Sequence, residues 1–535
     1  MKTTRQKSEN AVVPHARGNP GSTRVASATG GGKGVPVQEV TQQLMMAFMT
    51  AESPRGAAGG AGSDLSAPVP RKAPKMEVNL GSAGSATMEE VVRNLKGAFE
   101  KVAANRGAPG PDGKSVREVR DHLPQVISEL GPALLAGRYT PGDIRRVWIP
   151  KPGGGERGLG IPNVVDRMVQ EAVRRVIEPL YEPHFHPSSH GFRPGRSCQT
   201  AIAEAQRHTE EGHGWVVDID LEKFFDRVHH QRLMARLAER ISDRRLLILL
   251  GQMLKAGVVL PEGVRVSNDE GVPQGGPLSP LLSNIVLDEL DRELDRRGLH
   301  FVRYADDCNI YVSSERAGKR VMASISTFIR ERLRLQVNEK KSAVARPETR
   351  HFLGFRLRPQ VGGPTEVLLS ERTVKRLRDR IRELTPRRPG VAFDATIRAA
   401  SGYLKGWLGH FGVATEGTSV LFPARAADAH LRLRLRAIQL RHWKTRRTIV
   451  RRIISLKTTA KTAFKRIYEG RKSTWALANA PVVTRALSKN YFAVRGLVSL
   501  ADSFEGIWRS IAASKRQLTL PWGTRRSSSG QQPGS

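Results

Sequence analysis

Two short β-prone segments of this 535-residue chain carry acidic side chains, and they constrain the fold more than any other feature. The first, 215–221, reads Trp-Val-Val-Asp-Ile-Asp-Leu. Strict alternation places its odd-numbered apolar residues on one strand face and its two acids with Val216 on the other. The second, 301–312, holds Asp306 and Asp307 between two β-prone runs, as at the tip of a hairpin. We therefore expect a sheet with an apolar face that seals a core, an acidic face above it, and hairpin carboxylates that protrude into a cleft.

Aspartates gathered at one place repel one another and resist ionisation unless a divalent cation neutralises them. Proteins bind Mg²⁺ through a few carboxylates together with substrate phosphates. Two such ions, about 3.5–4 Å apart, suit in-line phosphoryl transfer. An Asp-Asp pair taken alone is more often a solvated turn, so its context in the sequence has to decide between these interpretations.

The charge balance indicates a polyanionic partner. Lys and Arg total 87 against 51 Asp and Glu, which gives a net charge of +36 and a pI near 11.0. The alternative is a basic chain whose charge only keeps it soluble. Segment 431–470 holds 13 Lys or Arg with Glu469 as its only acid, whereas a solvated helix face normally mixes signs. We therefore favour nucleic acid as the partner.

Several classes of protein are excluded by what the chain contains. Cys198 and Cys308 are its only cysteines, too few for a disulfide framework or a cysteine-based zinc module, so we expect no zinc. The longest early apolar run, 44–49, is far shorter than a membrane span and lies too far from the start for a signal peptide. We expect a cytoplasmic protein that does not bind membranes.

Composition also divides the chain into regions. Residues 1–85 mix Gly, Ala, Ser, Pro and Thr with little apolar periodicity, and we interpret them as a flexible, low-complexity extension. Folding is expected to start at Thr87, which can cap a helix. After about Pro364 the pattern becomes almost wholly helical and cationic. Between these points the pattern predicts helices at 123–135 and 321–333 and strands at 145–149, 215–221, 301–304 and 309–312.

Several sequence blocks then resemble one family in order and spacing. Tyr304-Ala305-Asp306-Asp307 resembles the catalytic hairpin of reverse transcriptases, and Asp220 followed by 224–226 resembles their first metal-binding strand. The further matching blocks are 149–154, 191–197, 271–280, 338–342, 352–355, 403–407 and 443–444. Over about residues 87 to 510 the chain is similar to bacterial group II intron reverse transcriptase/maturases, in a form without the C-terminal endonuclease.

The resemblance implies an α+β right-hand polymerase followed by a helical domain. The implied regions are fingers at 86–200, a palm at 201–365, and a helical thumb/maturase region at 366–470. Residues 471–535 are a basic C-terminal segment with a flexible tail, for which DNA binding is one interpretation. The implied function is RNA-directed DNA synthesis together with binding of a group II intron RNA, which assists splicing and supports retrohoming. The implied partners are that RNA, an RNA template, a DNA primer or target, and dNTPs, and the oligomeric state is left open.

The resemblance also implies the metal-binding side chains. Asp220, Asp306 and Asp307 would hold two Mg²⁺ ions, for which Mn²⁺ could substitute. Asp220 is preferred to Asp218 because the family places an aromatic residue five positions after its catalytic aspartate, and here that residue is Phe225. Phe225 would press against the sugar of the incoming nucleotide and exclude a 2′-hydroxyl. The alternative is that Phe225 is simply a core residue.

The remaining motif residues are assigned to the nucleotide and the primer end. Lys151 and Arg157 lie on either side of a Gly-rich bend and would clamp a triphosphate, although the bend alone would be a flexible turn. Gln274 would contact a base pair or its sugar. Pro273 and Gly275 flank it, and without the resemblance 273–275 would be an ordinary loop. Lys341 and Gly354 could instead be surface and turn residues. Tyr304, Ala305 and Asn338 are the other residues of the matching motifs.

Two alternative functions remain at this point. One is a maturase that acts only as an RNA-binding splicing factor, although the three aspartates argue against it. The other is a reverse transcriptase of a defence or CRISPR-associated system, which would lack the maturase region. In the helical part, Trp407, Phe411 and Trp443 could stack on unpaired bases, or they could be helix-packing core.

Overall fold

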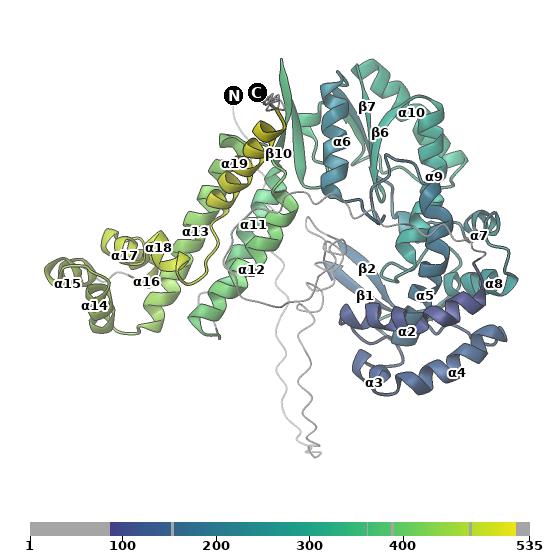
Figure 1. The fold of residues 1–535 in the computed structure, drawn as a ribbon, viewed down its shortest axis with the longest axis horizontal. Coiled ribbons are helices and arrows are strands. Elements are labelled where there is room, and N and C mark those ends of the chain that lie inside the picture. Colours follow the sequence, from purple (N-terminus) through teal and green to yellow (C-terminus); the bar gives the residue numbers. More distant parts are fainter. Residues whose placement is uncertain (1–85, 151–154, 361, 387–389, 470–472, 520–535) are drawn as a thin grey trace, which may run out of the picture.

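The computed structural model describes residues 86–150, 155–360, 362–386, 390–469 and 473–519. The expected flexible segment 1–85 and the end of the C-terminal tail lie outside these ranges. The described residues form a mixed α/β part followed by a wholly helical part, in agreement with the predicted fold class (Figure 1). No described helix combines the length and the apolar character that crossing a membrane would require.

The N-terminal unit begins at the predicted cap. The Thr87 side chain accepts a hydrogen bond from the Glu90 N–H, and the Glu90 side chain accepts one from the Thr87 N–H, which starts helix α2. The unit contains helices α2 (Met88–Ala104), α3 (Val116–Asp121), α4 (Leu123–Leu135) and α5 (Val164–Tyr181). Its four-stranded sheet has the order β2-β1-β4-β5, with β1 (Ile144–Pro150), β2 (Glu156–Ile161), β4 (Val258–Val259) and β5 (Arg265–Val266).

A second four-stranded sheet, here called the central sheet, carries the acidic segments. Its order is β6-β7-β3-β8, and each neighbouring pair is antiparallel. The strands are β3 (Trp215–Ile219), β6 (His300–Tyr304), β7 (Asp307–Val312) and β8 (Ala343–Ala345). Around the sheet lie η1 (Glu182–His184), α6 (Cys198–Glu210), η2 (Phe224–Asp226), α7 (His230–Ala238), α8 (Arg244–Leu254), α9 (Ser279–Arg296), α10 (Glu315–Glu331) and η3 (Pro347–Thr349).

The central sheet separates two hydrophobic clusters. Val217 and Ile219 face the first cluster, which extends into the N-terminal unit, as the predicted alternation requires. The prediction of an acidic, open face on this sheet is wrong, because Val216, on the other face of β3, is buried in the second cluster. Strand β3 is an inner strand with a core on both sides, so only its end can present a carboxylate to solvent. Asp220 lies just past that end.

The second cluster extends through a hairpin into the helical part. The expectation of helix after about Pro364 needs correction. Strand β10 (Gly363–Leu369) pairs with β9 (Phe355–Gln360) as far as Leu369 and buries Val367 and Leu368. The helices that follow are α11 (Glu371–Leu384), α12 (Phe393–Phe411), α13 (Thr418–His442), α14 (Arg446–Ser455), α15 (Ala460–Tyr468), α16 (Thr474–Ala478), α17 (Pro481–Ala486), α18 (Lys489–Ala493) and α19 (Leu500–Thr519).

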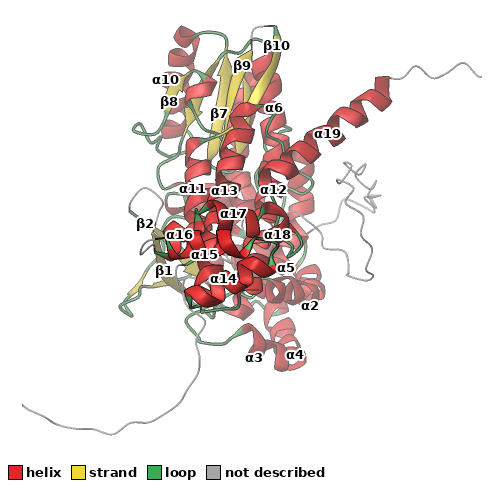
Figure 2. Cartoon of the chain, turned by 90° about the vertical axis from the view of Figure 1, so that its left-hand side faces the viewer, coloured by secondary structure: helices red, strands yellow, loops and turns green. Residues whose placement is uncertain are grey.

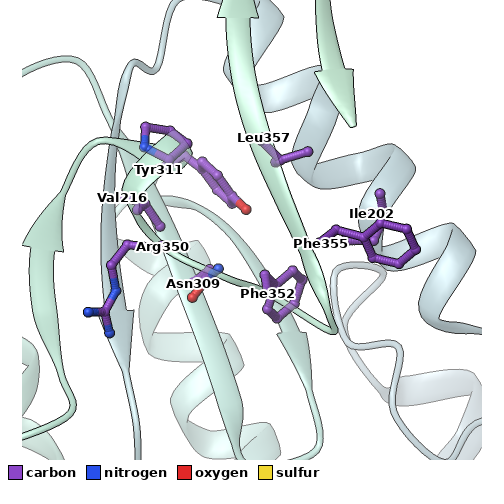
Figure 3. Close-up of a pocket in the computed structure, with 9 residues that line it drawn as sticks. Ile202, Val216, Asn309, Tyr311, Arg350, Phe352, Phe355 and Leu357 are labelled. Atoms are coloured by element: carbon purple, nitrogen blue, oxygen red, sulfur yellow. The ribbon is translucent and has the colours of Figure 1, made fainter. Parts of the chain in front are cut away.

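The junction between the central sheet and β9 is filled by side chains. A cavity of about 10 Å³ between Val216, Tyr311, Phe352 and Leu357 has room for no more than a water molecule (Figure 3). At the other end of the helical part, α14 to α18 cluster away from the strands (Figure 1), and they lie nearest the viewer when the molecule is seen from that side (Figure 2). The two parts of the molecule are therefore packed at one end and diverge at the other.

Candidate active site

The tip of the β6–β7 hairpin places two of the three predicted aspartates. Tyr304 pairs with Asp307, so that Ala305 and Asp306 form the turn between the strands. Ala305 has φ 57°, a left-handed conformation that costs a non-glycine residue energy unless the surroundings hold it. The predicted hairpin is therefore confirmed.

The register of β3 brings the third aspartate to the same point. Ile219 is opposite Cys308, so the next antiparallel positions are Asp220 and Asp307. The Asp220 N–H donates to Ser342 Oγ at 3.0 Å, and its carbonyl accepts from the Asn338 N–H at 2.8 Å. Asn338, one of the predicted motif residues, thus fixes the backbone of Asp220.

The electrostatics of the cluster are those of crowded carboxylates. Enclosure by protein atoms raises the pKa of Asp307 to about 7, and the charges of the neighbouring aspartates add to that shift, although solvent still reaches its side chain. Burial likewise raises the pKa of Asp306. Lys341, another predicted motif residue, lies with its Nζ 3.2 Å from both carboxylate oxygens of Asp220. The Lys341 ammonium group thus supplies positive charge beside Asp220, one of the clustered carboxylates.

The donor set fits Mg²⁺. Hard divalent ions are bound by carboxylate oxygens and reject sites rich in nitrogen or sulfur ligands. The three aspartates supply only such oxygens. Burial is the largest cause of the raised pKa values of Asp306 and Asp307, and repulsion between the carboxylates adds to it, which a divalent cation would relieve. Asp218 is different, because its Oδ2 accepts from Arg350 Nε at 2.9 Å and this ion pair already neutralises it.

Three of the predicted nucleotide-binding residues, Arg157, Gln274 and Phe225, are linked by hydrogen bonds through the 271–280 loop. Arg157, on β2, donates from Nε to Gln274 Oε1 at 2.9 Å. Burial raises the pKa of Asp306, and the positive charge of Arg157 offsets part of that rise, so Arg157 lies within electrostatic reach of the aspartates. Val272 N–H donates to the Phe225 carbonyl at 2.7 Å, which fixes the 271–280 loop beside η2. Lys151, the other half of the expected clamp, lies outside the described residues.

Backbone contacts hold the 271–280 loop against the N-terminal sheet. The Gly160 N–H donates to the Gln274 carbonyl at 2.7 Å, and Gly275 has φ +125°. A Cβ on Gly275 would lie 2.5 Å from the Gly160 carbonyl oxygen, so only glycine permits this approach. The Pro273 carbonyl accepts from Ser279 Oγ at 2.6 Å. Pro273 and Gly275 therefore position Gln274.

Phe225 shares features of both predicted roles, a residue that faces the nucleotide and a core residue. Its ring contacts Phe224 edge-on at 5.2 Å and packs against the first hydrophobic cluster, yet it stays partly exposed. Phe224 is fully buried. The Phe224 ring therefore belongs to the core, and the Phe225 ring lies at the surface of that core.

Comparison with known proteins identifies the two parts. Residues 149–357 match a family model described as Reverse transcriptase (RNA-dependent DNA polymerase). Residues 374–454 match one described as Group II intron, maturase-specific domain. The chain belongs to the group II intron reverse transcriptase/maturase family. The recognition from sequence blocks is thereby confirmed, including the order of the two parts.

Individual relatives agree with this assignment. The Group II intron-encoded protein LtrA of Lactococcus lactis is 29% identical over 337 residues, 50% of this chain and 55% of that protein. Protein YkfC of Escherichia coli is 43% identical over 202 residues, 37% of this chain and 53% of that protein. The chain thus spans about half the length of these curated relatives. A solved structure, the Partial Cas6-RT-Cas1--Cas2 complex, overlaps 46% of the chain at 22% identity with a TM-score of 0.30, which is too loose to carry an argument.

The reverse transcriptase part contains a buried network that the sequence analysis missed. Arg303 is fully buried and donates to both carboxylate oxygens of Asp291 at 2.7 and 2.6 Å. It also donates to the Ala305 carbonyl at 2.9 Å, and so holds the strained hairpin turn. A charged residue inside the apolar run 301–304 was the available signal, since an arginine there must find a buried partner.

Gly191 supports the same turn from outside. A Cβ on Gly191 would lie 2.3 Å from the Ala305 nitrogen, and the Gly191 carbonyl accepts from Asn284 Nδ2 at 2.9 Å. The block 191–197 was noted for its resemblance only, and its first glycine proves to be a packing surface for the hairpin. Tyr304 packs beside Phe192 with ring centroids 6.5 Å apart.

Gly354 and the three aromatic residues considered for base stacking all pack in or against the second hydrophobic cluster. Gly354 has φ +91°, and a Cβ there would come within 2.9 Å of Phe411, so this glycine allows the β9 turn to pack on α12. Trp407 and Phe411 are 7% and 9% exposed and belong to the second cluster, which favours the core interpretation for both. Trp443 is half-buried against that cluster.

Proposed function

We propose that this protein is an RNA-directed DNA polymerase that also binds a group II intron RNA, assists its splicing and supports retrohoming in the bacterial cytosol. The observation that carries the polymerase half is the convergence of Asp220, Asp306 and Asp307 at the ends of adjoining strands. The family assignment supports the pairing of this activity with an RNA-binding region.

The chemistry follows from the side chains around that point. The three aspartates would hold divalent ions, whose chemistry would be to activate a primer 3′-hydroxyl and to neutralise charge on the departing pyrophosphate. Arg157 and Lys341 add positive charge where a triphosphate would lie, with Arg157 aligned by Gln274. Lys341 must leave Asp220 or share it when a metal ion binds. Phe225 excludes the 2′-hydroxyl of a ribonucleotide, because its exposed edge offers no hydrogen bond.

The intron RNA would bind mainly on α14 and α15. Their surface carries exposed cations with few acids, and it also holds Phe464 and Tyr468, whose rings stack in parallel with centroids 6.0 Å apart. Phe464 is 51% exposed and Tyr468 47% exposed, which makes them better base-stacking platforms than the buried Trp407 and Phe411. The exposed cations of this surface are Arg447, Arg451, Arg452, Lys457, Lys461, Lys465 and Arg466.

Extension of a DNA primer on an RNA template, with Mg²⁺ or Mn²⁺, tests the polymerase proposal. The double variant Asp306→Ala/Asp307→Ala should abolish extension, because the metal ions lose most of their ligands. A matched control removes two exposed acids from the β4–β5 region, Glu262→Ala/Asp269→Ala, and should keep full activity. Extension by the aspartate variant at the wild-type rate would refute the proposal.

The same pair of variants separates catalysis from RNA binding. Intron affinity and splicing assistance should survive Asp306→Ala/Asp307→Ala, since α14 and α15 lie at the other end of the molecule. A wild-type protein that promotes splicing without extending primers would instead support the splicing-only alternative. Equal loss of both activities in the variant would contradict the proposed separation.

A further inference from the structure

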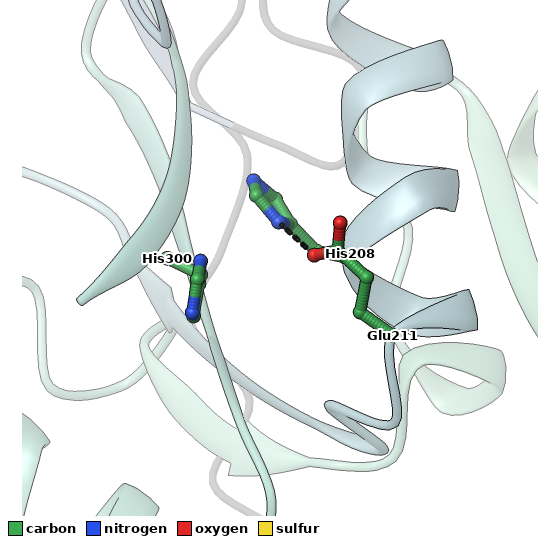
Figure 4. Close-up of side chains that lie close together, drawn as sticks. All are labelled: His208, Glu211 and His300. Carbon is green, nitrogen blue, oxygen red and sulfur yellow. Dashed lines mark hydrogen bonds and ion pairs between the residues drawn. The ribbon is translucent and has the colours of Figure 1, made fainter. Parts of the chain in front are cut away.

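Three metal-ligating side chains gather at the end of the central sheet opposite the aspartates. Figure 4 shows His208 and Glu211 at the C-terminal end of α6, with His300 beside them. His300 begins β6, which runs from there to the tip of the β6–β7 hairpin. One ligand atom from each residue lies within 4.8 Å of the others. His208 Nδ1 is 3.2 Å from Glu211 Oε2. Ligand atoms bound at about 2.0–2.1 Å to one tetrahedral ion lie roughly 3.3 Å apart. The His208–Glu211 pair already has this spacing, and His300 would need only a small movement to reach it.

A fourth donor adjoins this cluster. The imidazole ring of His213 lies 4.4 Å from that of His300, centroid to centroid. The backbone N–H of His213 donates to the His208 carbonyl at 3.3 Å, which ties the loop after α6 back onto the helix. Gly212 makes this turn possible with φ +95°, a conformation that L side chains rarely adopt.

His208 is buried, and one of its ring nitrogens has no hydrogen-bond partner. The residue is 5% exposed, and its Nε2 atom is enclosed by protein atoms without accepting or donating a hydrogen bond. Glu204 Oε1 lies 3.7 Å from Nε2, which is beyond hydrogen-bond distance, and Glu204 is held instead at 2.7 Å by Ser188 Oγ and at 2.7 Å by His190 Nε2. A buried imidazole nitrogen without a partner costs free energy, so His208 is the member of the cluster whose bonding is least satisfied.

We propose that His208, Glu211, His213 and His300 bind one divalent transition-metal ion, with Zn²⁺ as the best match. Imidazole nitrogens with a single carboxylate suit Zn²⁺ or Ni²⁺ and do not suit Mg²⁺, which the oxygen-only aspartate site prefers. The expectation of no zinc rested on the cysteine count, and this ligand set needs no cysteine. A bound ion would link the loop before β3 to the start of β6, and so brace the sheet that carries the aspartates.

Zinc binding by the full-length, untagged protein tests this assignment. The apo protein is titrated with Zn²⁺ against a chromogenic chelator, with Mg²⁺ in large excess to occupy the aspartates. We expect one tight site, a rise in Tm on binding, and visible Co²⁺ absorption typical of a tetrahedral ion when Co²⁺ replaces Zn²⁺. His300→Ala and Glu211→Gln should each weaken binding by at least about tenfold.

Two further variants make the outcome decisive. His122→Ala removes an exposed histidine outside the cluster and should leave zinc affinity unchanged. Asp306→Ala/Asp307→Ala should also keep the site, while its loss of primer extension reports on the polymerase proposal alone. Wild-type zinc affinity in both cluster variants, loss of binding in the aspartate variant, or no tight site in the wild-type protein would each overturn the assignment. Circular dichroism verifies that His300→Ala and Glu211→Gln are folded; because both positions are exposed, we expect that they are.

Discussion

The reverse transcriptase part and the maturase part use charge in opposite ways. In the first, three carboxylates meet at the ends of two strands, and each has an identifiable environment, such as Lys341 beside Asp220 or Arg350 on the neighbouring Asp218. In the second, exposed cations spread over α14 and α15 with few acids near them. One part therefore depends on the position of single atoms, whereas the other depends on summed charge. Substitutions in the two parts should differ accordingly.

The largest difference in primer extension is expected between variants of two aspartates that lie two residues apart. Asp220→Asn should lower primer extension by about three orders of magnitude, because it removes a charged metal ligand. Asp218→Asn should cost less than about tenfold, because Arg350 rather than a metal ion faces that carboxylate. Single-turnover extension rates measure both. Similar losses in the two variants would show that Asp218 also binds metal.

The next effect concerns the buried ion pair that holds the hairpin. Arg303→Met should lower the free energy of unfolding by about 3–5 kcal/mol, because Asp291 is left buried without its partner. Arg297→Met removes one of the two arginines that pair with the partly buried Glu293, and it should cost no more than about 1 kcal/mol because Arg296 still compensates that carboxylate. Urea unfolding measures both values. Recovery of stability in Arg303→Met/Asp291→Leu would confirm that the uncompensated charge is the cause.

A smaller difference in primer extension is expected between variants of two glycines, one packed tightly against the hairpin backbone and one with open space around it. Gly191→Ala should slow primer extension about tenfold, because its Cβ would press on Ala305 and displace the hairpin at a cost of about 1–3 kcal/mol. Gly406→Ala in α12 meets no atom within 4 Å and should leave extension unchanged. Intron RNA affinity should be the same in both variants. Unchanged extension in Gly191→Ala would mean that the hairpin tolerates movement.

The smallest effect is expected where charge acts in sum. Lys461→Gln/Lys465→Gln should lower RNA affinity only a few fold, but should reduce the slope of log affinity against log salt by about 1.4, or about 0.7 for each phosphate that the variant no longer neutralises. Lys319→Gln/Arg320→Gln on α10 is the matched control and should not change the slope. Filter-binding at several salt concentrations gives these slopes. An unchanged slope in the α15 variant would place the RNA elsewhere.

Much of the site was predictable because local patterns determine it. Alternation in 215–221 identified the residues that face the first core, and the Asp306-Asp307 pair between β-prone runs identified a hairpin tip. The Thr87 cap and the helix at 123–135 also follow from short-range signals, and both are confirmed. The second core was not predictable, because nothing near Val216 in the sequence indicates that β9 and the helical part cover it.

The sequence by itself determined which residues are the candidates for catalysis and metal binding, since residue type, spacing and the order of motifs are properties of the chain. Only the tertiary structure showed which contacts distinguish Asp218 from Asp220 and hold the hairpin in place. Arg350 reaches Asp218 from 132 positions away, and Arg303 holds the hairpin through Asp291 and Ala305. Such contacts depend on how strands and helices pack, and no local pattern records them. The histidine cluster has the same origin, because α6 and β6 bring His208 and His300 together only when the sheet is formed.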